Sequence, residues 1–515
     1  AEGEERPVDD LQTHLRAAVG ADECVEIDEP ATGRASGSGA HRFTVPAAAC
    51  HTTTRDSAAR EAVRDDGRGT VRRRARRTEG VRMGQRGFAT RQLHECPRGA
   101  APTARATPIY LTAGFEFDEY GQAAAHFGQG EGYAYTRIGN PTIEAAEHTL
   151  ASLEDGSQAL LLASGQAATS VALLALLEAG QHVVSSTHIY EGTRALLNDN
   201  LTRLGIETTY VDAIEDTEAW EAAIRPETRA LFAESISNAT NRLIDIAAVA
   251  DVAHRHGIPL IIDNTFATPY LLRPIEHGAD VVVHSASKFL AGHGSVLGGA
   301  IVDSGTFDAE RSGALFPHLV APGRNGTPSL AERTGGDARI AYARESVAPR
   351  FGPTPSPLNA FLIGQGIETL SIRVERQSEN ALAVAQWLAG RPEIASVDYV
   401  GLPSHRDHRL AAAYLPDGYG SVFTFTVHGG AEAAQRLVEG LEVFTHMTHL
   451  GDVRSLILHP ASTSHVGLGS DERLALGVEP GTLRVSIGIE DVEDLIGDLA
   501  AALAQVGSIV GAARV

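Results

Sequence analysis

ADVVVHSASK, residues 279–288, decides how the rest of the sequence is interpreted. Its first part is a short β-branched run bounded by polar residues, which predicts a buried strand. It ends at Lys288, the only lysine among 515 residues, while the chain holds 43 basic residues in all. Arginine keeps its proton and forms no stable imine, whereas a lysine amine can react with a carbonyl. The stretch therefore predicts a strand that ends at a reactive amine.

Short apolar segments of the same kind recur on both sides of this stretch. Further strands are predicted over residues 159–164, 182–186, 206–212, 229–235 and 259–266. Helices are predicted over 165–180, where Gly180 closes the helix, and over 245–257. Alternating strands and helices predict an α/β fold with a mostly parallel sheet that is covered on both faces.

The composition predicts how the chain is divided. Residues 1–82 contain one aromatic residue, Phe43, and no sustained period, so we expect a disordered or wrongly included extension. We expect an N-terminal arm over 83–134 and a large cofactor-binding domain over 135–350. A long helical stretch at 361–390 is followed by short strands at 421–427 and 483–489. These segments predict a smaller C-terminal α/β domain over 351–515.

Charge and cysteine content exclude several classes of function. The formal net charge is −22, which argues against nucleic-acid binding and against an anionic membrane surface. The three cysteines are scattered along the chain and do not form a disulfide framework. The sequence has no apolar run long enough to span a membrane. We therefore expect a cytoplasmic protein. The 21 histidines lack metal-ligand spacing, so no metal is predicted.

Several residues are predicted to meet Lys288 at the carboxyl edge of the sheet, where open α/β sheets bind ligands. Ser164 is placed to cap a helix, which leaves the N–H groups of Gly165 and Gln166 free for an anion, although a simple capped helix is the alternative. Asp263 ends a buried strand, where a carboxylate needs a cationic partner such as a protonated pyridine nitrogen.

Further polar residues suit a phosphate group. Ser285 and Ser287 flank the lysine, and Tyr135 and Arg137 stand two residues apart, just before a helix predicted to start with Asn140 as cap and Pro141 in the first turn. A lysine, an isolated aspartate and a phosphate site together favour pyridoxal phosphate as the cofactor.

In this order, YTRIGNPT, ASGQAA, IIDNTFATPY, HSASKF and HPASTSH resemble the cystathionine γ-synthase family of pyridoxal-phosphate enzymes, from about Gly87 to the C-terminus. The resemblance is greatest to its O-acetylhomoserine sulfhydrylase branch. It implies fold type I, the aspartate-aminotransferase-like fold, and a homotetramer with active sites at dimer interfaces.

The resemblance also implies a role for each site residue. Lys288 would bind the cofactor and shuttle protons, Asp263 would pair with the pyridinium nitrogen, and Tyr190 would stack on the ring. The phosphate would be bound by Ser164, Gly165, Gln166, Ser285 and Ser287, with Tyr135 and Arg137 reaching it from the neighbouring subunit. Asn238 would touch the ring hydroxyl, and Arg484, with Ser455 nearby, would bind the substrate carboxylate.

The implied reaction is γ-replacement, in which O-acetyl-L-homoserine and sulfide or a thiol give homocysteine or methionine and acetate. The chain departs from the family pattern at Ala239, where proline is usual, and at Ser287, where threonine is common. It also departs within 110–117, 325–330 and 465–468. These departures leave open a γ-lyase, a cystathionine synthase or an enzyme that uses another nucleophile. A catalytically silent scaffold is a further alternative.

Overall fold

The computed structural model describes residues 86–95, 104–129, 132–238, 240–323 and 326–512. The predicted disorder of residues 1–82 and the departure at Ala239 lie outside these ranges, so both stay predictions. In the described part of the chain, no helix is long and apolar enough to cross a membrane. All of the described residues belong to one compact unit.

The larger sheet has seven strands in the order β1-β7-β6-β5-β4-β2-β3. The strands are β1 (Gln158–Leu162), β2 (His182–Ser186), β3 (Glu207–Val211), β4 (Thr228–Glu234), β5 (Leu260–Asp263), β6 (Val281–His284) and β7 (Gly299–Asp303). The strands from β6 to β3 pair in parallel, while β7 is antiparallel to both β1 and β6. The mostly parallel sheet predicted from the sequence is confirmed. Since β1 therefore runs in the same direction as β6, their carboxyl ends lie at one edge.

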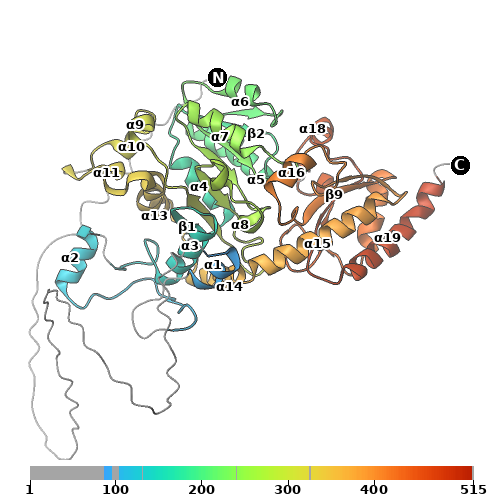
Figure 1. Cartoon of the computed structure of the whole chain (residues 1–515), viewed down its shortest axis with the longest axis horizontal. Coiled ribbons are helices and arrows are strands. Elements are labelled where there is room, and N and C mark those ends of the chain that lie inside the picture. Colours follow the sequence, from blue (N-terminus) through green and yellow to red (C-terminus); the bar gives the residue numbers. More distant parts are fainter. Residues whose placement is uncertain (1–85, 96–103, 130–131, 239, 324–325, 513–515) are drawn as a thin grey trace, which may run out of the picture. The chain divides into compact units, whose positions relative to one another are not determined.

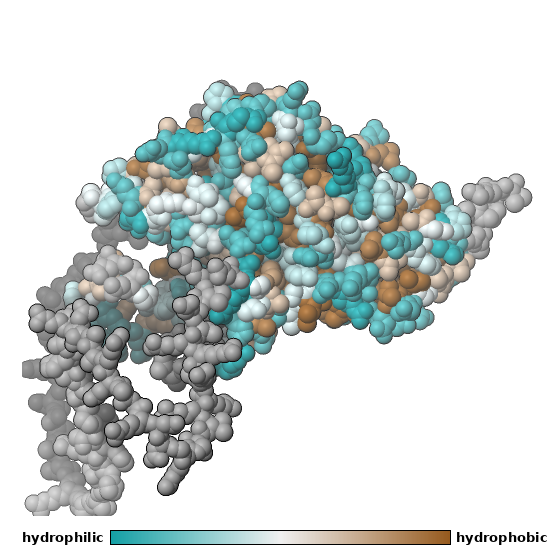
Figure 2. Space-filling view, viewed as in Figure 1, coloured by the Kyte–Doolittle hydropathy of each residue, from teal (hydrophilic) through white to brown (hydrophobic). Residues whose placement is uncertain are grey.

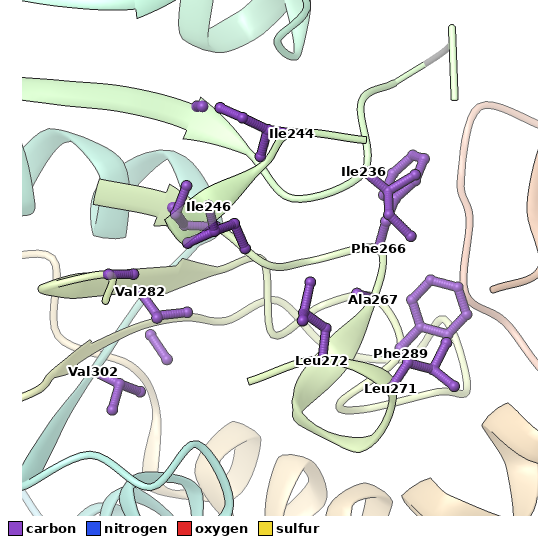
Figure 3. Close-up of a cluster of buried hydrophobic side chains, with 14 of the residues drawn as sticks. Ile236, Ile244, Ile246, Phe266, Ala267, Leu271, Leu272, Val282, Phe289 and Val302 are labelled. Atoms are coloured by element: carbon purple, nitrogen blue, oxygen red, sulfur yellow. The ribbon is translucent and has the colours of Figure 1, made fainter. Parts of the chain in front are cut away.

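Helices cover both faces of this sheet (Figure 1). Alternate strand residues enter two separate cores, with Ile262 in one and Ile261 in the other. Figure 3 shows part of the first core, where Phe289 lies beside Leu271. Because Phe289 is fully buried, it fixes the backbone directly after Lys288.

The helices of this part of the chain differ widely in length. They are α1 (Phe88–His94), α2 (Tyr120–Gln129), α3 (Pro141–Leu153), α4 (Gly165–Leu174), α5 (Glu191–Ala195), α6 (Thr217–Ala223), α7 (Ile246–Arg255), α8 (Thr268–Leu271), α9 (Ala309–Ser312), α10 (Pro317–Val320), α11 (Leu330–Thr334), α12 (Ala338–Tyr342), α13 (Ala348–Phe351) and α14 (Pro357–Ile367). Two π-helical turns, η2 (Leu196–Leu201) and η7 (Ala343–Val347), extend α5 and α12.

A second, five-stranded sheet has the order β10-β11-β12-β9-β8. Its strands are β8 (Ile394–Asp398), β9 (Val422–Val427), β10 (Thr445–His446), β11 (Leu456–Leu458) and β12 (Thr482–Ser486). Its helices are α15 (Leu370–Ala389), α16 (His408–Tyr414), α17 (Gly430–Glu439), α18 (Ser470–Ala475) and α19 (Val492–Ala512). Residues of α15, α17 and α19 share one core with β9 and β12. A second α/β portion was predicted, and its proposed boundary near residue 350 stays a prediction.

Two predicted helices end differently. The helix that starts at Gly165 ends at Leu174 rather than at Gly180, and Glu178 N, within the predicted range, donates to the side chain of Gln181. The single helical stretch predicted over 361–390 is two helices, α14 and α15. It breaks where the Arg373 guanidinium takes the carbonyl of Gly366, at 2.6 Å.

Candidate active site

Lys288 lies in the turn directly after β6, with its side chain partly buried. Its Nζ is 3.0 Å from Nδ1 of His449. Burial and, to a smaller extent, the positive charge of Arg484 together lower the pKa of Lys288 to about 8. The amine can therefore lose its proton far more easily than an exposed lysine.

The N-terminus of α4 lies against the segment that leads to Lys288. Ser164 caps this helix by accepting a hydrogen bond from Ala167 N at 3.2 Å, as predicted. A Cβ on Gly165 would lie 2.8 Å from the Cβ of Ser285, so only glycine lets these two segments approach. The first N–H groups of α4 and the hydroxyl of Ser285 thus meet at one place.

Ser287 is placed differently from Ser285. Its side chain is buried, and its hydroxyl donates to Gly298 O at 3.1 Å and accepts from Gly298 N at 3.0 Å. In this structure its hydroxyl proton is already used to fix the glycine turn. The predicted phosphate contact of Ser287 therefore needs that hydrogen bond to be exchanged.

Asp263 stands at the end of β5 with one carboxylate oxygen bound and one free. Oδ1 accepts from the backbone N and the hydroxyl of Thr265, at 2.9 and 2.5 Å, and that hydroxyl also accepts from Ser285 N at 2.8 Å. Both of these hydrogen bonds are to Oδ1, and Oδ2 accepts none from a described residue. Burial raises the pKa of Asp263, so a cationic partner at Oδ2 would favour its ionised form.

Glu234 ends β4 directly beside Asp263 in the register of the sheet. Its two oxygens accept from Tyr190 N at 2.5 Å and from Asn238 N at 3.0 Å. Burial and the negative charge of Asp263 raise the pKa of Glu234. This carboxylate joins the segments that carry Tyr190 and Asn238.

Arg484 projects from β12, on the second sheet, and its side chain is buried. Nη1 donates to Oδ1 of Asn238 at 3.1 Å, and Nη2 makes long contacts of 3.4 Å with the carbonyls of Thr448 and His449. No carboxylate among the described residues forms a salt bridge with it. Burial lowers the pKa of Arg484 to about 10, and this uncompensated cation suits an anionic ligand.

The ring of Tyr190 lies beside Gly192 and remains 46% exposed. Gln166 donates from Nε2 to Gly192 O at 2.9 Å, which connects the start of α4 to the Tyr190 turn. Tyr190, Gln166 and Gly165 therefore border the same region as Lys288 and Asp263.

Tyr135 and Arg137 lie elsewhere in this chain. The Arg137 guanidinium stacks over the Tyr135 ring at 5.4 Å and donates to Pro349 O at 2.5 Å. Both side chains are exposed, and none of their contacts among the described residues is with Lys288 or Ser285. Just beyond them, Asn140 caps α3 with Pro141 in its first turn, as predicted.

Ser455 is fully buried away from an open surface. Its hydroxyl donates to Glu490 at 2.9 Å and accepts from Gly488 N at 2.9 Å. These contacts hold the start of β11 against the chain that follows β12. The structure thus gives Ser455 a partner other than a substrate carboxylate.

Two residues of the site, Glu234 and His449, were missed in the sequence. Glu234 ends a predicted buried strand, so the argument that selected Asp263 could have selected it as well. His449 is 161 residues from Lys288, and no local pattern connects the two.

The described residues fit pyridoxal phosphate. Asp263 Oδ2 lacks a partner, a Cβ would fill the space between Gly165 and Ser285, and Lys288 carries an amine of lowered pKa. Lys288 would hold the cofactor, Asp263 its ring nitrogen, and the start of α4 with Ser285 its phosphate. In the described part of the chain, no group of His, Cys, Asp or Glu is arranged to hold a metal ion.

Comparison with known families identifies the class. The model of the Cys/Met metabolism PLP-dependent enzymes matches residues 89–504, so the chain belongs to this family and is a pyridoxal-phosphate-dependent enzyme. The family resemblance stated from the motifs is confirmed.

Individual relatives match over nearly their whole length. The chain is 40% identical to homocysteine synthase of Schizosaccharomyces pombe over 420 residues, which is 81% of this chain and 98% of that protein. It is 41% identical to O-acetyl-L-homoserine sulfhydrylase of Corynebacterium glutamicum, over 81% of this chain and 96% of that one. Among solved structures, an assigned O-acetylhomoserine (thiol)-lyase of Campylobacter jejuni, which contains N'-pyridoxyl-lysine-5'-monophosphate, has a TM-score of 0.76 and 35% identity, over 81% and 99% of the two chains.

Proposed function

We propose that this protein catalyses γ-replacement, in which O-acetyl-L-homoserine and sulfide give L-homocysteine and acetate in the cytoplasm. The observation that carries this proposal concerns two cations. A buried arginine, Arg484, which forms no salt bridge with a described carboxylate, and the only lysine of the chain both contact His449. An amino acid bound through its carboxylate at Arg484 would bring its Cα close to Lys288 Nζ. The names of the relatives supply the substrate.

Each residue has one task in this reaction. When bound, pyridoxal phosphate supplies an electron sink beside Cα. Asp263 would pair with the protonated ring nitrogen, and Arg484 would fix the substrate carboxylate. Lys288 Nζ would take the Cα proton and release it before it takes one from Cβ, because a neutral amine accepts a single proton. The C–O bond at Cγ then breaks and acetate leaves, hydrosulfide forms the new C–S bond at Cγ, and one proton returns to each of Cβ and Cα. The chain contributes to the rate by placing one base and one carboxylate-binding arginine in a fixed position relative to the reacting carbon atoms.

The proposal includes a homo-oligomer, with a tetramer as the expected state. Hydrophobic side chains are exposed near Tyr135 and Arg137, with Leu111 and Phe351 each 70% exposed. Figure 2 shows hydrophobic residues scattered among hydrophilic ones on the visible face. A second copy that covers Leu111 and Phe351 would also receive Tyr135 and Arg137 at its own site.

The test follows the visible absorption of the protein loaded with pyridoxal phosphate while O-acetylhomoserine and then sulfide are added. We expect a band that shifts with the amino acid, and homocysteine only after sulfide. The Lys288→Ala variant should show neither. Release of ammonia and a keto acid without sulfide would identify a γ-lyase instead, and a band unresponsive to any amino acid would indicate a silent scaffold.

A further inference from the structure

His449 lies on the loop between β10 and β11 and faces Lys288 from the second sheet. Its Nδ1 is 3.0 Å from Lys288 Nζ. Its Nε2 is buried and has no partner among the described residues. The imidazole therefore has one polar contact, and that contact is with the only lysine of the chain.

The backbone of this loop is fixed on both sides, so the position of His449 is well determined. Gly451 has a φ of +74°, and a Cβ there would lie 2.7 Å from Phe289 N, so glycine is required for the close approach. Gly451 N donates to the hydroxyl of Ser486 at 2.9 Å, and Val453 N donates to Gly292 O at 2.9 Å. The loop is thus held between β12 and the segment that follows Lys288.

The charges around the pair decide which partner holds the proton. Burial and the charge of Lys288 lower the pKa of His449 to about 4, against about 8 for Lys288. Asp452 opposes this shift, while Arg484 and Arg454 add to it. Because the pKa of Lys288 lies well above that of His449, His449 stays neutral and does not take the proton from Lys288.

We propose that His449 is a positioning residue that accepts a hydrogen bond from Lys288 Nζ through Nδ1 and so aims the amine at the reacting carbon. Its backbone carbonyl contacts Arg484 Nη2 at 3.4 Å. His449 therefore fixes the position of the Lys288 amine through its side chain and contacts Arg484 through its backbone carbonyl. The expected effect on turnover rests on the proposed function. The hydrogen bond between Lys288 and His449 does not depend on it.

A side-chain substitution at His449 leaves the backbone contact with Arg484 in place. We therefore expect His449→Leu to lower kcat by about 10- to 100-fold while the KM for the amino acid changes by less than about threefold. His449→Asn should recover most of kcat, because the Asn Oδ1 lies where Nδ1 of the histidine lies and can accept the same hydrogen bond.

The direct test measures the pKa of Lys288 in the full-length protein without cofactor. Lys288 is the only lysine, so competitive labelling with an amine reagent, followed by peptide mapping, reports one side chain. Loss of the acceptor disfavours the ammonium form, so His449→Leu should lower this pKa by about one unit and His449→Asn should retain it. His446→Leu is the matched control, since His446 lies on β10 of the same sheet and is exposed.

An unchanged or raised Lys288 pKa in His449→Leu would overturn the inference, as would an Asn variant that behaves like Leu. If His449→Leu does not fold, His449→Ala serves for the same measurement. Labelling requires no turnover. If the Lys288 pKa falls as predicted in His449→Leu but the wild-type protein has no sulfhydrylase activity, only the proposed function is refuted. If the wild-type protein is active but the Lys288 pKa does not change in His449→Leu, only the proposed role of His449 is refuted.

Discussion

Arg484 is the residue whose chemistry depends most on what binds beside it. Its guanidinium is buried with a side-chain amide and two distant carbonyls as partners, and burial lowers its pKa to about 10. A buried charge without a counter-ion costs stability unless a ligand supplies one. A ligand carboxylate would supply the counter-ion that Arg484 lacks among the described residues.

The first prediction concerns this residue. Arg484→Lys keeps a positive charge but loses the planar pair of donors that a carboxylate binds. We expect the KM for the amino acid to rise about 10- to 100-fold, because one or more charged hydrogen bonds are lost. Steady-state kinetics measure this change. Arg436→Lys, on the exposed face of α17 and paired with Glu432, is the control; an equal rise there would refute a specific role.

At the scale of elements, the ends of β4 and β5 place two carboxylates side by side. Burial and Asp263 raise the pKa of Glu234. A carboxyl whose pKa is raised on folding binds its proton more tightly in the folded state than in the unfolded state. The folded state is then favoured at low pH, and this contribution is lost as pH rises above about 4.5 toward the folded pKa.

The second prediction follows from this direction of the pH dependence. In the cofactor-free protein, the free energy of unfolding should fall with rising pH in that window, and Glu234→Gln should flatten the fall. The substitution itself should cost about 1 kcal/mol, since the amide accepts only one of the two backbone hydrogen bonds. Urea unfolding at a series of pH values tests this, with the exposed Glu345→Gln as control. A slope unchanged in Glu234→Gln would contradict the argument.

The antiparallel strand β7 is joined to its neighbour by a buried ion network. Arg339 of α12 donates to Asp303 at 3.0 Å and to Asp280 at 3.3 Å, and these three side chains are at most 8% exposed. Removing the cation would leave Asp303 buried without its counter-ion and would leave Asp280 with His254 as its remaining cationic partner.

The third prediction is therefore a large loss of stability in Arg339→Met, by about 3–5 kcal/mol. Arg333→Met is a matched control, because Arg333 pairs with Glu345 at 2.7 Å on the surface, where such a pair contributes less than about 1 kcal/mol. Urea denaturation of both variants measures the difference. Equal losses would mean that burial is not the deciding factor.

At the scale of the whole molecule, Tyr135 and Arg137 are exposed, and none of their contacts among the described residues is with Lys288. If they serve the site of a second copy, subunits with different defects should complement one another. Each hybrid dimer of Lys288→Ala and Arg137→Ala subunits would then contain one intact site.

The fourth prediction is that co-refolded equal amounts of these two variants recover about a quarter of wild-type turnover, although each alone is nearly inactive. Turnover no higher than the mean of the parents would place Arg137 in the site of its own chain. In parallel, Phe351→Glu should lower the mass measured by light scattering, because it places a charge on the exposed hydrophobic surface. A control charge at the exposed Leu204 should leave the mass unchanged.

The sequence predicted the parts of the fold that depend on local patterns. Strands β2, β4, β5 and β6 were recognised because β-branched runs between turn residues have few alternatives. The caps Asn140 and Ser164 were recognised because their side chains bond within three residues. The antiparallel β7 was missed because it directly follows a glycine-rich stretch that was interpreted as a tight turn. The break between α14 and α15 was missed because it coincides with a hydrogen bond from the Arg373 side chain to Gly366 O, which the apolar pattern does not reveal.

For the candidate site, the sequence by itself determined the chemistry: one lysine at a strand end, Asp263 on the neighbouring strand, and motifs in the order of a known family. Only the tertiary structure decided which side chains meet. It brought His449 to Lys288 and Arg484 to Asn238, across 161 and 246 residues, and it gave Ser455 and Ser287 other partners. The reason is physical: local patterns fix where a strand ends, while contacts between two sheets depend on how their cores pack.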